Sequence, residues 1–194
     1  MRNSDQKLHD LARELARKLE SHDSGCAREL AAALREEELT ATRAAAGEAA
    51  DNLARAIEGT GDGLSPALTL AAPHLAWHEG GFGKTRDRGR ITLLVSQLLN
   101  RTGADGIGNV KLGLLLIAPQ YAYPIHSHAA EELYLVLSGG LDWRVDGKEI
   151  GPKSAGDFVH HSPWQRHAMT TGADPALLFW GWTGDTRSET YRMH

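Results

Sequence analysis

A histidine-rich stretch in the second half of the chain holds residue types that bind divalent metal ions. HSHAAEELY, residues 126–134, contains two imidazoles, two carboxylates and a phenol within nine positions. Imidazole nitrogens and carboxylate oxygens suit Zn²⁺, Fe²⁺, Mn²⁺ or Ni²⁺, and the stretch has no thiolate that would select zinc. This composition predicts a site for a divalent metal ion.

Strand alternation would bring several of these side chains to one face. If residues 131–139 form a strand, Glu132 and Tyr134 point to the same side. His126 and His128 are also two positions apart, and a short turn could place them over Glu132 and Tyr134. A buried carboxylate without a partner is costly, which favours metal ligands. The alternative is a set of hydrogen-bonded polar groups in an ordinary sheet.

The residues after about position 75 have the pattern of a β protein. Short apolar runs, rich in β-branched and aromatic residues, are separated by turn residues. Gly139-Gly140 and Asp146-Gly147 are typical of tight turns between strands. The spacing predicts an all-β sandwich or barrel. Residues 91–99 fit a strand or a helix equally well.

The first 58 residues have a helical pattern instead. Leucines recur at three- and four-residue steps in the first twenty positions, and a second run rich in Ala, Leu, Glu and Arg follows. Gly47 is expected to interrupt that second run. We therefore expect a helical segment at 1–58, a Gly/Pro/Ser-containing connector at 59–74 and a metal-binding barrel at 75–194.

Composition and charge exclude several classes of protein. The chain has 194 residues, 41% hydrophobic and 24% charged, as is typical of a soluble globular protein. Its net charge is −4, and residues 1–58 carry nine Lys or Arg against twelve Asp or Glu. This acidic balance argues against a nucleic-acid partner and against a helix-turn-helix reader. The helical segment is expected to pack on the barrel or on a second subunit, so we expect a monomer or a homodimer.

The sequence also bears on location. No apolar run approaches the ~20 residues that span a bilayer, and the N-terminus lacks the apolar region of a secretory signal. A single cysteine, Cys26, excludes an internal disulfide. We expect a cytoplasmic protein with no membrane partner.

Two segments resemble the conserved motifs of the cupins. HSHAAEELYLVLSG has the form H-x-H-x3-E-x6-G of the first cupin motif. Its defining positions are occupied by His126, His128, Glu132 and Gly139. GPKSAGDFVHHSPWQRHAM resembles a degenerate second motif, with Gly156 at its turn and His167 as its late histidine. The resemblance implies a mainly β fold, the cupin double-stranded β-helix or jelly-roll barrel, preceded by N-terminal α-helices.

A more specific resemblance is to the cupin dimethylsulfoniopropionate lyases, the DddQ type in particular. It is carried by YAYPIHSHAAEELYLVLSG, HHSPWQRHAM and FWGWTGDT, together with the helical segment before the barrel. It implies cleavage of a small sulfonium carboxylate, dimethylsulfoniopropionate, to dimethyl sulfide and acrylate. It also implies one divalent metal ion per chain, which would be Zn, Fe, Mn, Ni or Co.

The resemblance assigns roles to residues as well. The implied metal ligands are His128, Glu132 and His167, with Tyr134 as a fourth ligand. Tyr123 is the implied general base, and His126 then lies beside the ligands, where we assign it to the substrate.

The implied reaction is a β-elimination, which removes a proton α to a carboxylate and expels a neutral sulfide. A divalent metal stabilises charge that develops on the carboxylate. A tyrosinate is a strong enough base, and both Tyr123 and Tyr134 lie near the metal motif. Aromatic faces attract a sulfonium cation, and the candidates are Trp143, Trp164, Trp180 and Trp182. We assign Trp182 to this role, because its FWGW segment carries part of the resemblance.

Two alternatives remain open from the sequence. A non-haem iron dioxygenase of the cupin fold would use the same His/Glu/His set, but it would consume oxygen. A cupin sensor or binding module would bind a ligand without converting it.

Overall fold

The computed structural model describes residues 4–36, 39, 49–61, 63–80, 86–87, 90–104 and 109–194. The helices of the first part are α1 (Ser4–Leu19), α2 (Gly25–Glu36), α3 (Ala49–Glu58), α4 (Leu64–Ala71) and the 3-10 helix η1 (Ala72–His74). The first strands are β1 (His78–Glu79), β2 (Arg86–Asp87), β3 (Arg90–Ile91), β4 (Leu93–Arg101), β5 (Val110–Ile117) and β6 (Ala122–Ser127). They are followed by β7 (Glu131–Ser138), β8 (Gly140–Val145), β9 (Lys148–Ser154), β10 (Phe158–His161), β11 (His167–Thr171) and β12 (Ala176–Thr183). The chain ends with the 3-10 helix η3 (Ser188–Thr190) and β13 (Arg192–Met193).

Two antiparallel sheets form the barrel. One has the strand order β1-β4-β5-β12-β7-β10 and the other the order β13-β6-β11-β8-β9. Neighbouring strands in these sheets often lie far apart in sequence, as in the pairing of β12 with both β5 and β7. Such crossovers are typical of a jelly roll. The mainly β cupin fold that the sequence predicts is therefore confirmed.

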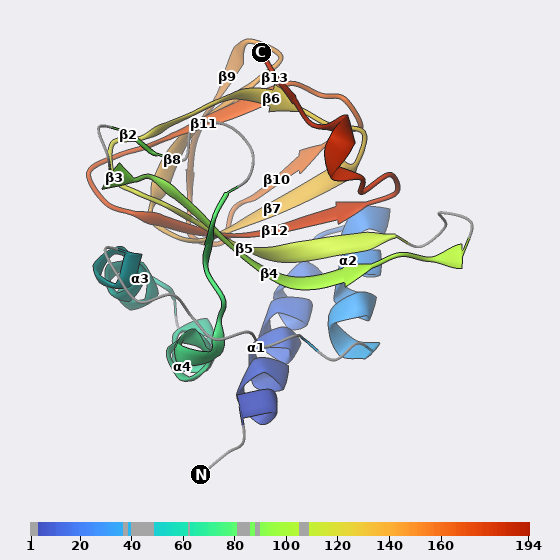
Figure 1. Cartoon of the computed structure of the whole chain (residues 1–194), viewed down its shortest axis with the longest axis vertical. Coiled ribbons are helices and arrows are strands. Elements are labelled where there is room, and N and C mark those ends of the chain that lie inside the picture. Colours follow the sequence, from blue (N-terminus) through green and yellow to red (C-terminus); the bar gives the residue numbers. More distant parts are fainter. Residues whose placement is uncertain are drawn as a thin grey trace.

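The side chains of the six-stranded sheet divide between two cores. One face encloses the barrel interior, where aromatic residues such as Tyr134, Trp143 and Trp182 pack. The opposite face, with Leu112, Leu114 and others, packs against the buried side of the helices. Figure 1 shows the helices grouped along this outer side of the barrel. The helical segment thus packs on the barrel, one of the two arrangements expected from the sequence.

The helices begin and end where local chemistry favours it. The leucine stripe of α1 is buried at Leu8, Leu11, Leu15 and Leu19. The break between α1 and α2 has a capping residue, since the Ser24 hydroxyl accepts a hydrogen bond from the Ala27 N–H at 3.0 Å. Residues 40–48, including the expected interruption at Gly47, lie outside the described residues.

The structure differs from the sequence expectation in one segment and decides an open question in another. Part of the expected connector forms helix α4, which begins after Gly63 and carries Pro66 in its first turn. Proline is tolerated there because the N–H groups of a first turn have no partner within the helix. The undecided segment 91–99 contributes mainly to strand β4.

None of the helices within the described ranges is long and apolar enough to cross a bilayer.

Both predicted tight turns are present. Gly139 joins β7 to β8 with φ of 80°, and a Cβ at this position would lie 2.5 Å from the Pro175 carbonyl oxygen. Asp146 and Gly147 join β8 to β9 with φ of 48° and 78°. Positive φ at both central residues is typical of the turn type that fits the twist of a hairpin.

Candidate functional site

Three buried side chains from different parts of the chain meet inside the barrel. His128 follows β6, Glu132 lies on β7 and His167 begins β11. None of them is more than 2% exposed. One nitrogen or oxygen atom of each lies within 4.8 Å of the others. The structure therefore brings together the three residues that the sequence predicts as metal ligands.

Backbone contacts determine which nitrogen of each histidine carries a proton. The Nδ1 atom of His128 lies 3.2 Å from the Ala130 carbonyl oxygen, and that of His167 lies 2.9 Å from the Gln165 carbonyl oxygen. A carbonyl oxygen only accepts, so each Nδ1 must carry the proton. In the neutral ring, Nε2 then keeps its lone pair. Such a backbone hydrogen bond is how proteins orient metal-binding histidines.

Both Nε2 atoms face the same carboxylate oxygen. The Glu132 Oε2 atom lies 2.9 Å from His128 Nε2 and 3.1 Å from His167 Nε2. The 3.1 Å contact of His167 Nε2 lacks hydrogen-bond geometry, so this buried nitrogen has no hydrogen-bond partner within the described residues. Lone pairs and a carboxylate that converge this closely repel one another unless a cation lies between them, either a proton on one of the imidazoles or a metal ion. The donor set therefore fits a divalent metal ion, which His128, Glu132 and His167 could hold.

Glu132 is also held by its neighbours on the sheet. The Trp182 Nε1–H donates to Glu132 Oε1 at 2.6 Å, and Trp182 lies opposite Glu132 in the pairing of β12 with β7. Burial alone would raise the pKa of Glu132, but the interactions with His128 and His167 outweigh it and hold this pKa well below its usual value. The carboxylate is therefore ionised and correctly oriented to bind a cation.

Tyr134 lies two residues beyond Glu132 on the same face of β7. Burial, followed by the Glu132 charge, raises the pKa of Tyr134 well above its usual value. Its ring centroid lies 6.2 Å from that of His167. The expected position of Tyr134 beside the ligands thus agrees with the structure, while its role as a fourth ligand stays a prediction.

A pair of tyrosines adjoins the ligands. The hydroxyl groups of Tyr123, on β6, and Tyr191, just before β13, lie 2.8 Å apart. The ring of His126 stacks on both tyrosine rings, and its centroid lies 4.5 Å from that of Tyr123 and 5.1 Å from that of Tyr191. Burial raises the pKa of Tyr123, and the hydrogen bond with Tyr191 partly offsets this effect.

His126 differs from the two histidine ligands. Its Nδ1 lies 2.8 Å from the Pro124 carbonyl oxygen, and its ring centroid lies 4.1 Å from that of His167. Burial, followed by the His167 charge, lowers the pKa of His126 to about 3. It does not belong to the group of three converging ligand atoms. His126 is therefore a neutral ring that supports His167 from the side.

These side chains surround one small cavity of about 50 Å³. Its wall consists of Val95, Leu115, Tyr123, His126, Glu132, Tyr134, Trp180, Trp182 and Tyr191. A cavity of this size holds on the order of four water molecules. Its wall is mainly aromatic and apolar, with Glu132 as its carboxylate.

The adjacent histidines of β10 point in opposite directions, as alternation predicts. His161 is fully buried, stacks on His167 at a centroid distance of 4.0 Å, and accepts a hydrogen bond from Trp143 Nε1 at 3.2 Å. His160 is exposed and lies 2.7 Å from Glu131. His161 therefore packs against His167 and supports its orientation, whereas His160 lies on the surface.

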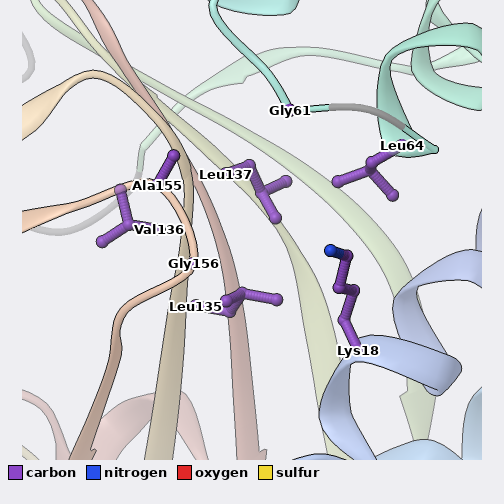
Figure 2. Close-up of a pocket in the computed structure, with 8 residues that line it drawn as sticks. All are labelled: Lys18, Gly61, Leu64, Leu135, Val136, Leu137, Ala155 and Gly156. Atoms are coloured by element: carbon purple, nitrogen blue, oxygen red, sulfur yellow. The ribbon is translucent and has the colours of Figure 1, made fainter.

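A second hollow lies outside the barrel, against the outer face of the six-stranded sheet. It has a volume of about 120 Å³ and lies between α1, the start of α4 and strand β7. Figure 2 shows Lys18 reaching from its helix toward Leu135 and Leu137. Lys18 is the one ionisable side chain in this lining. The hollow therefore lacks the ligands and bases that the barrel cavity contains.

Sequence reasoning missed Tyr191 entirely. This residue lies in the last four positions of the chain, outside any motif, and reaches the cavity because β13 pairs with β6. Trp180 is one of several candidate tryptophans in the sequence, and the structure places it in the cavity lining beside Trp182. No local sequence signal separates these two residues from ordinary core aromatics.

A cupin barrel with a buried His/Glu/His group able to hold a metal ion defines the class of protein. Comparison with known families is more specific. Residues 19–178 match the model of the dimethylsulfoniopropionate (DMSP) lyase family. The chain belongs to this family.

Two curated relatives agree with this assignment. A proposed dimethylsulfoniopropionate lyase, DddL, from Cereibacter sphaeroides is 31% identical over 139 residues, which cover 69% of this chain. The dimethylsulfoniopropionate lyase DddQ from Ruegeria pomeroyi is 36% identical over 66 residues, which cover 32% of this chain. The chain spans 58% of the length of the first relative and 31% of the second.

Solved structures show the same fold over nearly the whole chain. A chain from crystal structures of the DMSP lyases RdDddP and RnDddQII superimposes with a TM-score of 0.73 and 25% identity, over 99% of this chain and 100% of that one. The DMSP lyase DddQ from Ruegeria pomeroyi DSS-3 superimposes with a TM-score of 0.69 and 20% identity, over 97% of this chain and 96% of that one. The second likeness shows a shared fold, helices included.

Proposed function

We propose that this protein is a metal-dependent lyase that cleaves dimethylsulfoniopropionate to dimethyl sulfide and acrylate by β-elimination. The observation that carries the proposal is the convergence of His128, Glu132 and His167 beside a small cavity, which Glu132 lines together with two hydrogen-bonded tyrosines. Membership of the DMSP lyase family supports the substrate. The aromatic lining of the cavity suits the cationic end of a small sulfonium carboxylate.

One divalent ion, Zn, Fe, Mn, Ni or Co, would be held by His128, Glu132 and His167, with Tyr134 as a further ligand. The converging lone pairs of the two histidines support this assignment. When bound, the ion would act as a Lewis acid for the negative charge that develops on the substrate carboxylate. The chain itself orients the ligands through Trp182 and the backbone carbonyl groups.

Tyr123 is the proposed general base. As a tyrosinate it would take the proton α to the carboxylate, the electron pair of that C–H bond would form the carbon–carbon double bond, and the C–S bond would break. Dimethyl sulfide leaves as a neutral molecule with the electron pair of the broken bond. Tyr191 supports this role because its hydroxyl can donate to the Tyr123 oxygen and favours the ionised form. Tyr134 is the alternative base.

The remaining groups of the cavity would bind the substrate. Aromatic faces attract a sulfonium cation, and the rings of Trp182 and the neutral His126 both line the cavity. The absence of any thiol from this lining agrees with an elimination that uses no cysteine. We keep the cytoplasm as the predicted location and a monomer or homodimer as the predicted state.

The test is product formation by the purified chain incubated with dimethylsulfoniopropionate, with and without oxygen. We expect dimethyl sulfide and acrylate in equal amounts under both conditions, measured by headspace gas chromatography and liquid chromatography. Oxygen-dependent product would indicate a dioxygenase, and binding without product would indicate a sensor.

The chain offers a matched pair of variants for this test. Glu132→Gln removes the buried carboxylate, whereas Glu131→Gln changes the adjacent residue, which bonds His160 at the surface. We expect the first variant to lose at least about 100-fold in rate, as when a catalytic group is removed, and the second to retain the parental rate. Equal effects of the two variants would contradict the proposed site.

A further inference from the structure

Trp180 carries a buried hydrogen-bond donor that has no acceptor among the described residues. Its side chain lines the barrel cavity and is 8% exposed. Within the described residues, its Nε1 atom is buried and has no hydrogen-bond partner. Leaving such a donor unsatisfied destabilises the fold, so each case in a native protein asks for an explanation. A donor in the wall of a ligand cavity can be satisfied by the ligand.

The position of Trp180 places this donor next to the proposed metal ligands. In the pairing of β12 with β7, Trp182 lies opposite Glu132 and Trp180 lies opposite Tyr134. The two indole rings share the inner face of β12, with centroids 5.6 Å apart. The Trp182 N–H is bound to Glu132. Trp180 therefore carries a second indole N–H on the same inner face of β12, two residues before the first.

The cavity offers few internal acceptors for this N–H. Glu132 already faces Trp182 and both histidine ligands. The hydroxyls of Tyr123 and Tyr191 bond each other. No acceptor within the described residues reaches the Trp180 N–H, so the molecule that enters the cavity is the candidate to supply one.

We infer that Trp180 Nε1–H donates a hydrogen bond to the carboxylate of the substrate and so selects for carboxylates. The inference rests on the proposed function, because it takes a sulfonium carboxylate as the substrate. Such a molecule carries its hydrogen-bond acceptors at one end alone. The two carboxylate oxygens accept, while the sulfonium group is attracted to aromatic faces. The Trp180 donor thus sets the orientation in which the substrate enters.

The variant that tests this is Trp180→Phe, which keeps an aromatic ring and removes the N–H. A hydrogen bond to a charged group is worth roughly tenfold or more in binding. We expect KM for dimethylsulfoniopropionate to rise by about this factor while kcat changes little. Unchanged KM in the folded variant would overturn the inference.

Trp77→Phe is the matched control. Trp77 is also buried, and its Nε1 also lacks a partner within the described residues. It belongs to the core between the helices and the sheet and does not line the cavity. We expect its KM to equal that of the parent protein. An equal rise of KM in both variants would show a general packing effect and would contradict the inference.

Two half-substrates separate the donor from the ring. Propionate carries the carboxylate alone, and trimethylsulfonium carries the cation alone. We expect Trp180→Phe to weaken propionate binding about tenfold and to leave trimethylsulfonium binding unchanged. Weaker binding of trimethylsulfonium with unchanged propionate binding would assign the ring to the cation instead.

Nuclear magnetic resonance of the parent chain gives a test that does not depend on a folded variant. The five tryptophans each give one indole N–H signal, and the Trp180 signal should move downfield with propionate but not with trimethylsulfonium. No shift with propionate would overturn the inference. A parent protein that yields no dimethyl sulfide but shows this shift would instead refute the lyase proposal alone.

Discussion

Trp182 is expected to hold the Glu132 carboxylate in place for the metal. Its Nε1–H donates to Glu132 Oε1 at 2.6 Å, and both side chains are buried. Trp182→Phe keeps an aromatic ring but removes the donor. Loss of a hydrogen bond to a charged group costs about 1.5–3 kcal/mol, and loss of a group that orients a metal ligand lowers metal affinity about 10- to 100-fold. The two ranges agree, so we expect a loss of metal affinity of about this size.

The assay is competition for zinc or iron with a chromophoric chelator, together with kcat at saturating metal. We expect metal affinity to fall while saturating metal restores most of kcat. Trp77→Phe, in the other core, should leave metal affinity unchanged. The ring of Trp182 already contacts His128, at a centroid distance of 4.3 Å, and the Lys111 ammonium, at 5.5 Å. Unchanged metal affinity would refute this reasoning and leave Trp182 with its proposed role at the sulfonium group alone.

Four further predictions follow from the site and the core. Tyr123→Phe should lower kcat by at least about 100-fold at unchanged metal affinity, measured by steady-state kinetics and chelator competition; parental kcat would exclude Tyr123 as the base. Tyr191→Phe removes the 2.8 Å contact that lowers the pKa of Tyr123, so the acidic limb of the kcat/KM profile should move to higher pH, and an unmoved limb would contradict this. Leu30→Ala removes a fully buried side chain that packs on Gly181 of β12 and should cost about 2–5 kcal/mol in denaturant unfolding; a cost near zero would refute the packing argument. Burial raises the pKa of the Cys26 thiol to about 12, so the native protein should not react with a thiol reagent below pH 9, and rapid labelling would contradict that burial.

The first part of the site was predictable because its residues are close in sequence. His126, His128, Glu132 and Tyr134 lie within nine positions. Strand alternation alone predicts that they share the barrel interior, and they do. His167 is different, since it reaches the cluster through the pairing of β11 with β6, in which it lies opposite His126. Only the family resemblance indicated that long-range contact.

Tyr191 shows where sequence reasoning ends. Its place at the cavity depends on β13, a strand of two residues that pairs with Ser127 and His126. A strand of that length has no periodicity to detect. The unpartnered N–H of Trp180 likewise depends on its three-dimensional surroundings. Trp180 and Trp182 lie two positions apart on β12, so strand alternation gives both the same face and does not distinguish their N–H groups.

The fold was predictable in outline but less so at the junction of its two parts. Gly, Ser and Pro at 59–74 indicated a connector, yet Leu64–Ala71 is helical. Its buried residues, Leu64, Ala67, Leu68 and Ala71, recur with helical spacing and pack in the core under the sheet. That tertiary packing outweighs the local preference for a loop. The division of the chain at 58 and 74 stays a prediction.

Metal content and lyase activity measured on the same sample test the central claim most directly. Chelation should remove both the metal and the production of dimethyl sulfide. Activity should then return in proportion to added divalent metal and level off at one equivalent per chain. Full activity in metal-free protein would contradict the account, as would folded, metal-loaded protein that releases no dimethyl sulfide from dimethylsulfoniopropionate.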